Sequence, residues 1–258
     1  MATLVSADWV SERIGKDGFT IVDPRRPMRY LAGHLRGAIN VPMYKLFGAD
    51  GWLMESAALA EFFGVSGLSS ASIPVLYDSP EGQNAAMLAW TLEYLGMPEV
   101  SIMREFYETW KSSGREVLYR PVTAKPAKFE GRLNPASRIG IEEAKRADGV
   151  RFVDFRSVEE FSGARVMGED QAGHIPGAIN VVWRDLGGGS EAILKDRAEL
   201  TALLRARGIE RGAQVVAYCR SGPRAALGYL ALKEAGYDVR LYDGSWAEWS
   251  RAGLPVEK

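Results

Sequence analysis

The sequence predicts an α/β protein with two similar domains in tandem, each a mainly parallel sheet with helices on both faces. Three observations predict this architecture. The 258 residues suffice for about two domains of ordinary size. A group of motifs occurs twice in the same order, and short apolar runs alternate with helical patterns within each copy.

The two copies are most alike at a Gly-His-x-x-Gly-Ala-Ile-Asn segment, which occupies residues 33–40 and again 173–180. Before it, an apolar run followed by Asp-x-Arg is found at 21–25 and at 152–156. The same order of motifs over a domain-sized distance indicates duplication of a whole domain rather than a short-period solenoid.

A proline-rich stretch separates the copies. Residues 120–135 contain three prolines and show little apolar periodicity, which is typical of an ordered or semi-rigid linker. We therefore expect an N-terminal domain over 1–115, a linker over 116–135 and a C-terminal domain over 136–258.

Four apolar runs in the second copy have the length and residue types of strands: 151–155, 178–182, 214–218 and 238–242. Helical spacing of Leu and Ala predicts helices over 194–207 and 225–235, which end at Gly208 and Gly236. Strands that alternate with helices form parallel sheets that are covered on both faces.

Composition excludes several classes of function. A formal net charge of -1 gives no general attraction to nucleic acid or to anionic lipid. A single cysteine rules out an internal disulfide, and two histidines with one cysteine cannot build a structural zinc site. The sequence shows no leader-like start, no bilayer-spanning apolar stretch, no glycine-rich phosphate motif and no metal-ligand spacing. These features predict a cytoplasmic enzyme or binding protein without a cofactor.

The chemistry is expected at Cys219, where the apolar run 214–218 ends and a short loop leads into a helix. Ligands of parallel α/β sheets bind beyond the carboxyl ends of the strands. The start of the following helix offers free N–H groups and about half a positive charge, and Arg220 and Arg224 add two full charges. We therefore expect Cys219 to be an accessible thiolate at neutral pH. The alternative is a small buried side chain without chemistry.

The combination of motifs resembles that of tandem-domain rhodaneses, which are sulfurtransferases. It comprises the two Gly-His segments, the two Asp-x-Arg pairs, the Cys219 loop and the Asp-Gly-Ser-Trp segment at 243–246, in family order across nearly the whole chain. The resemblance implies a catalytic C-terminal domain and a non-catalytic N-terminal domain. It also implies that Cys219 accepts the outer sulfur of a donor as a persulfide and passes it to a nucleophile.

The first copy lacks the means for this chemistry. Asp78 stands at the position that matches Cys219, and a carboxylate cannot accept a sulfane sulfur. Its loop, 78–84, is one residue longer than the loop of the second copy and lacks both arginines. We expect Asp78 to be held as an anion by the helix that follows. His34 and His174 occupy matching places, so we expect each to fasten its own loop rather than to act as a base.

Substrate-binding residues are expected in the loop itself: Arg220, Ser221, Gly222 and Arg224. Outside the loop, the resemblance places Arg156 at the substrate anion. It matches Arg165 to a second carboxylate-binding position of mercaptopyruvate enzymes. The alternative for Arg156 is a salt bridge, because Arg25 occupies the same place in the inert copy, and the alternative for Arg165 is a solvated loop charge.

These observations predict a sulfurtransferase that moves a sulfane sulfur from thiosulfate to cyanide or a thiol acceptor through a Cys219 persulfide. The two loop arginines favour the more highly charged thiosulfate, and 3-mercaptopyruvate is the alternative donor. Two other classes are a non-enzymatic persulfide carrier or regulatory module and a Cys-dependent phosphatase. The resemblance implies that loops of six residues suit sulfur donors, which disfavours the phosphatase. The predicted partners are small-molecule donors and acceptors, with no nucleic acid and no membrane.

Overall fold

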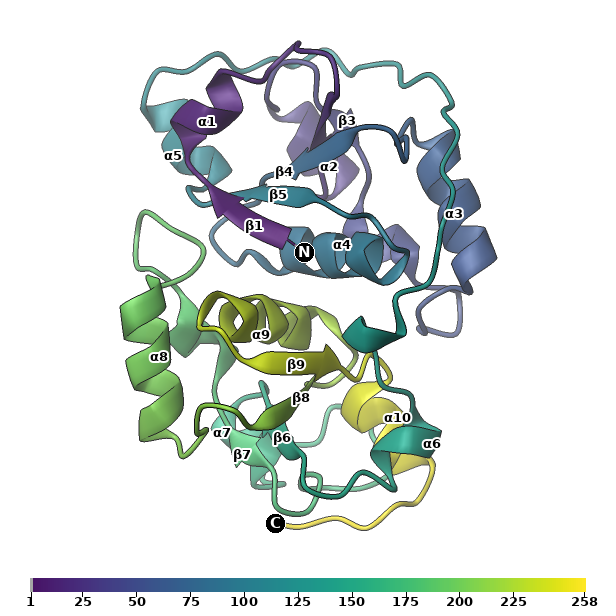
Figure 1. The fold of residues 1–258 in the computed structure, drawn as a ribbon, viewed down its shortest axis with the longest axis vertical. Helices are drawn as coiled ribbons and strands as arrows, with labels where there is room; N and C mark the ends of the chain where they lie inside the picture. Colours follow the sequence, from purple (N-terminus) through teal and green to yellow (C-terminus); the bar gives the residue numbers. More distant parts are fainter. Residues whose placement is uncertain (1) are drawn as a thin grey trace. The chain divides into compact units, whose positions relative to one another are not determined.

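The structure is a computed structural model that describes residues 2–258, and these residues form two compact units. The first comprises the described residues up to Asn134 together with Gly188–Leu194, and the second comprises Pro135–Gly187 with Lys195–Lys258. Each unit contains a parallel sheet flanked by helices (Figure 1), which confirms the predicted fold class. No helix in this range is long and apolar enough to cross a membrane.

The first unit contains a five-stranded sheet in the order β1-β5-β4-β2-β3, and all its strand pairs are parallel. Its strands are β1 (Ala2–Val5), β2 (Phe19–Asp23), β3 (Ile39–Asn40), β4 (Ile73–Leu76) and β5 (Val100–Met103). Its helices are α1 (Ala7–Ser11), α2 (Pro27–Leu31), α3 (Ser56–Val65), α4 (Gln83–Tyr94) and α5 (Tyr107–Ser112), with a 3-10 turn at Met43–Leu46.

The second unit contains a four-stranded parallel sheet in the order β7-β6-β8-β9. Its strands are β6 (Arg151–Asp154), β7 (Ile179–Asn180), β8 (Gln214–Tyr218) and β9 (Asp238–Leu241). Its helices are α6 (Ile141–Ala144), α7 (Val158–Phe161), α8 (Arg197–Ala206), α9 (Pro223–Glu234) and α10 (Ser245–Arg251), with 3-10 turns at Pro135–Ser137 and Trp183–Leu186. The strand order repeats β3-β2-β4-β5 of the first unit, so the duplication extends to the topology.

The predicted strands and helices of the second copy are present, some with shifted ends. Strand β8 has the predicted bounds, whereas β7 is shorter than predicted. Helix α8 begins later than predicted, at Arg197, because Asp196 and Glu199 form a capping box in which each side chain accepts the other's backbone N–H. Helix α9 begins earlier than predicted, at Pro223, since proline is favoured in the first turn of a helix.

Two further segments complete the first unit. Within Gly188–Leu194, Ala192 forms an antiparallel bridge with Glu105. In the stretch after α5, Leu118 and His34 exchange two backbone hydrogen bonds of 2.8 and 2.9 Å. The chain after α5 is therefore packed on the first unit. The division into units differs from the division into copies, because Gly188–Leu194 of the second copy belongs to the first unit.

Gly228 allows α9 to approach Phe155, the residue that follows β6. A Cβ atom at position 228 would lie 2.3 Å from the Phe155 ring, and Phe155 is fully buried. We expect Gly228→Ala to lower the free energy of unfolding by about 1–3 kcal/mol, because overpacking a close-packed core forces neighbouring groups apart. Urea denaturation of the two proteins measures this difference.

Gly187→Ala is the matched control. At this residue φ is -64° and a Cβ atom would meet its nearest neighbour at 3.5 Å, which is an ordinary contact. We expect its effect to stay within about 0.5 kcal/mol. Equal losses in the two variants would show that the Phe155 contact is not the cause.

Candidate active site

Cys219 lies at the carboxyl end of a central strand and at the entrance to a helix. It follows β8, which pairs with β6 on one side and β9 on the other. Gly222, just before α9, has φ of 108°, a conformation that favours glycine, and its backbone N–H donates to Cys219 Sγ over 3.2 Å. The next residue, Pro223, has no N–H to offer. The start of α9 thus presents its N–H group and its dipole to the sulfur.

The thiol is more enclosed than the sequence suggests. Cys219 is 1% exposed, whereas we expected an accessible side chain. The enclosure has a local cause, because Cys219 continues a strand whose last two residues, Ala217 and Tyr218, are fully buried, and because Sγ turns toward the Gly222 N–H. In this conformation Cys219 therefore exposes little surface to a donor.

The Asp-Gly-Ser-Trp segment holds the main chain of the loop. The Cys219 N–H donates to Ser245 Oγ over 3.2 Å, and the Trp246 N–H donates to the Cys219 carbonyl over 3.0 Å. The Ala247 N–H donates to the Arg220 carbonyl over 3.0 Å. Ser245 has φ of 55° and is the one non-glycine residue between positions 2 and 258 with positive φ, a strained geometry of the kind found at functional sites. These contacts fix the backbone from which the thiol projects.

Arg224 is paired with Glu160 in a two-pronged contact. Arg224 Nη1 donates to Oε2 over 2.6 Å and Nη2 donates to Oε1 over 2.9 Å. A capping box with Ser157 at the start of α7 holds Glu160 in place. Burial acts to raise the pKa of Glu160, but hydrogen bonding and charge from Arg224 outweigh it and lower this pKa to about 2. Burial acts to lower the pKa of Arg224, but hydrogen bonding with Glu160 and the charge of Cys219 outweigh it and raise this pKa.

Arg220 is also paired with a carboxylate. Its Nε donates to Glu169 Oε1, and its Nη2 donates to the Met167 carbonyl over 2.8 Å. The second oxygen of Glu169 accepts the Met167 N–H over 2.6 Å. Burial acts to raise the pKa of Glu169, but hydrogen bonds from Arg220 and from the Met167 N–H lower it below its usual value. Both arginines of the Cys219 loop therefore have an ionised partner at neutral pH.

Arg156 is buried in an ion pair with Asp154. Its Nη2 donates to Asp154 Oδ2 over 2.6 Å and to the Gly173 carbonyl over 2.7 Å, and its Nε donates to both oxygens of Asp154. The two residues are 2% and 0% exposed. Arg25 and Asp23 make the same pair in the first unit, where Asp78 replaces the cysteine. This geometry matches the salt-bridge alternative, and Arg156 exposes little surface.

The remaining predicted residues lie around the loop. Ser221 is partly exposed within it. Arg165 is exposed in the segment after α7, where its backbone N–H donates to the Glu159 carbonyl over 2.9 Å. His174 Nδ1 lies 2.9 Å from the Phe161 carbonyl, and its ring stacks on that of Phe161 with centroids 3.6 Å apart. His174 thus fastens its own loop to α7, as the sequence predicts.

The two carboxylates that pair with the loop arginines were not predicted from the sequence. Glu160 carries one signal, because Ser-x-x-Glu at 157–160 is a capping-box pattern that places a helix start after β6. Glu169 carries none, since it is separated from Arg220 by 51 positions in an irregular segment.

Asp78 in the first unit occupies the place of the thiol. Its Oδ1 accepts the Ser79 N–H over 2.8 Å, and its Oδ2 accepts the Ala85 N–H from the first turn of α4 over 2.9 Å. Burial raises the pKa of Asp78 to about 6, against the opposing effect of these hydrogen bonds. The carboxylate itself fills the helix start, and no nucleophilic sulfur is present there.

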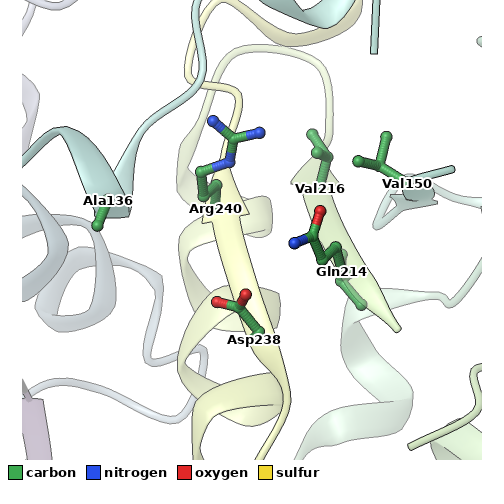
Figure 2. A pocket seen from close by; sticks show the side chains of 7 residues that line it. Ala136, Val150, Gln214, Val216, Asp238 and Arg240 are labelled. Carbon is green, nitrogen blue, oxygen red and sulfur yellow. The ribbon is translucent and has the colours of Figure 1, made fainter. Parts of the chain in front are cut away.

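A separate pocket of about 190 Å³ opens at the other end of the second sheet (Figure 2). Gln214 and Asp238, which line it, begin β8 and β9, whereas Cys219 follows the end of β8. The pocket is therefore not part of the Cys219 site. Within the part of the chain that the structure describes, no group of three or more His, Cys, Asp and Glu side chains is placed to hold a metal ion.

Comparison with known proteins agrees with this arrangement. The model of the rhodanese-like domain matches residues 6–113 and again 141–252. A thiosulfate sulfurtransferase of Corynebacterium glutamicum is 30% identical over 98% of this chain and 90% of its own. A 3-mercaptopyruvate sulfurtransferase of Escherichia coli is 29% identical over 98% of this chain and 97% of its own.

A solved structure shows the same fold. The crystal structure of SseA from Escherichia coli, described with the rhodanese fold, superposes with a TM-score of 0.85 at 27% identity and covers 95% of this chain and 99% of that chain. The domain model matches the chain twice, the relatives are similar over almost the full length, and the two sheets of the chain share one strand order. The chain belongs to the rhodanese family and carries two rhodanese-like domains.

Proposed function

We propose that this protein is a sulfurtransferase that takes the sulfane sulfur of thiosulfate and passes it to cyanide or a thiol through a persulfide on Cys219. The observation that carries the proposal is the position of Cys219 Sγ, which accepts the Gly222 N–H at the start of α9 in a loop that also contains Arg220 and Arg224. These groups stabilise a thiolate and, after transfer, a persulfide anion.

The proposed reaction has two displacement steps. In the first, the Cys219 thiolate attacks the outer sulfur of thiosulfate, a new S–S bond forms, the S–S bond of thiosulfate breaks, and its electron pair leaves with sulfite. In the second, cyanide attacks the outer sulfur of the persulfide, thiocyanate leaves, and the thiolate is restored. Each step conserves charge, and no oxidant or reductant is needed. Ping-pong kinetics follow from this sequence.

A monoanionic donor, 3-mercaptopyruvate, is the second candidate, and one observation favours it. Both loop arginines are already paired with carboxylates, so the loop offers less free positive charge to a dianion than its sequence suggests. Relatives of this chain include both a thiosulfate and a 3-mercaptopyruvate sulfurtransferase.

Initial rates with the two donors, with cyanide as acceptor, test the proposal. We expect kcat/KM to be higher for thiosulfate. A value at least about tenfold higher for 3-mercaptopyruvate would assign the second donor instead, a difference that corresponds to about 1.4 kcal/mol of transition-state stabilisation. Transfer from neither donor would contradict a sulfurtransferase, and turnover of an aryl phosphate that depends on Cys219 would indicate a phosphatase.

A further inference from the structure

We propose that Glu169 controls which anions react at Cys219, because it holds the Arg220 guanidinium until an incoming donor displaces it. Glu169 is thus a positioning residue, which acts on the donor through Arg220. The kinetic part of this inference rests on the proposed sulfurtransferase function, but the charge effect at Cys219 does not.

The Glu169 carboxylate is bound where an anion would contact Arg220. One carboxylate oxygen binds the Arg220 Nε, and the other accepts the Met167 N–H, so neither oxygen is left without a partner. The carboxylate is well enclosed, with its side chain 5% exposed, while that of Arg220 is 40% exposed. The guanidinium therefore has an open side at which a second anion can approach, although its charge is already matched.

Charge is balanced around the loop as a whole. Three guanidinium groups each face their own carboxylate, in the pairs Arg220–Glu169, Arg224–Glu160 and Arg156–Asp154. The arginine side chains of the last two pairs are 20% and 3% exposed. The Arg220–Glu169 pair has the most exposed arginine and is the one that a donor can open at the smallest cost in desolvation.

The consequence is selective for charge. An anionic donor that binds Arg220 has two routes. It either displaces the Glu169 carboxylate from the guanidinium, or it approaches the guanidinium while Glu169 stays bound. Repulsion from that carboxylate grows with the charge of the donor, so a dianion is disfavoured more than a monoanion, and a neutral molecule is unaffected. Glu169 thereby offsets the preference for thiosulfate that two loop arginines alone would give.

The first test uses alkylation of Cys219 in the substrate-free protein. Iodoacetate and iodoacetamide are similar in size, but only iodoacetate is charged, so the ratio of their rate constants reports charge and cancels changes in exposure. We expect Glu169→Gln to raise the iodoacetate-to-iodoacetamide ratio about fivefold, as removal of the carboxylate from a partly exposed ion pair can do. The Gln side chain keeps a carbonyl oxygen for the Met167 N–H.

Asp170→Asn is the matched control. Asp170 is an exposed acid next to Glu169, so its replacement makes the same change in net charge. We expect the ratio to change less than about twofold in this variant, because a solvated charge is screened. An unchanged ratio in Glu169→Gln, or equal changes in the two variants, would overturn the proposal. Thermal unfolding of each variant shows whether the fold is kept.

The second test measures donor kinetics. We expect Glu169→Gln to lower the KM for thiosulfate about fivefold, to lower that for 3-mercaptopyruvate by less, and to leave kcat nearly unchanged. Equal changes for both donors would contradict selection by charge. If the alkylation ratio rises while neither donor transfers sulfur, the charge role of Glu169 stands and the proposed function fails.

Discussion

Replacement of Cys219 by serine is expected to lower sulfur transfer at least about a thousandfold, with the fold retained. A serine hydroxyl can accept the Gly222 N–H that now reaches Sγ, so the packing of the loop is preserved. It cannot ionise at neutral pH as a thiol does, nor can it form a persulfide. Cyanide-dependent formation of thiocyanate from thiosulfate measures the loss.

Ser79→Ala is the control for this variant. Ser79 follows Asp78 in the first unit, at the loop that matches the Cys219 loop, and its side chain makes an exposed contact of 3.3 Å with Glu108. Since a carboxylate stands in place of the thiol there, we expect wild-type transfer rates in this variant. Substantial sulfur transfer by Cys219→Ser would show that the reaction does not need the cysteine. A large loss in Ser79→Ala would show that the first unit takes part in it.

Arg156→Ala is expected to cause the largest loss of stability, about 3–5 kcal/mol in the second unit. The substitution leaves the Asp154 carboxylate, which is 0% exposed, without the guanidinium that neutralises it. It also removes the donor to the Gly173 carbonyl, which precedes the His174 turn. Chemical denaturation followed by near-ultraviolet circular dichroism measures the loss.

Two companion variants separate a structural role of Arg156 from binding of the donor. Arg25→Ala removes the equivalent partner of Asp23 in the first unit, and we expect a comparable loss of stability there. Arg156→Lys keeps a charge beside Asp154, and we expect the folded protein to retain its KM for thiosulfate within about twofold. A large rise in the KM for thiosulfate in Arg156→Lys, without a loss of stability, would show that Arg156 binds the donor.

The sequence predicts the architecture well because the relevant signals are local. The run Gln214–Tyr218 forms a strand with the predicted ends, and α9 follows the loop as the pattern of Leu and Ala requires. The duplicated motifs predict a shared topology, which the two sheets show. Strand periodicity, glycines at helix ends and repeats are all read over short stretches of chain.

The electrostatic partners could not be predicted because they are set by tertiary contacts. Arg220 and Arg224 lie in the same six-residue loop as Cys219, and closeness in sequence alone suggests two free charges for a dianionic donor. Their carboxylate partners lie 51 and 64 positions away. Segment Gly188–Leu194 gives a second example, since tertiary contacts with Arg104 and Glu105 make it part of the first unit.

The intact mass of the protein, measured after incubation with thiosulfate and removal of the free donor, shows whether Cys219 carries sulfur during transfer. We expect an increase equal to one sulfur atom, located on the peptide that contains Cys219 and reversed by cyanide. The Cys219→Ser protein should show no such increase. An unchanged mass under conditions in which the protein forms thiocyanate would contradict a persulfide on Cys219, because sulfur would then be transferred without residing there.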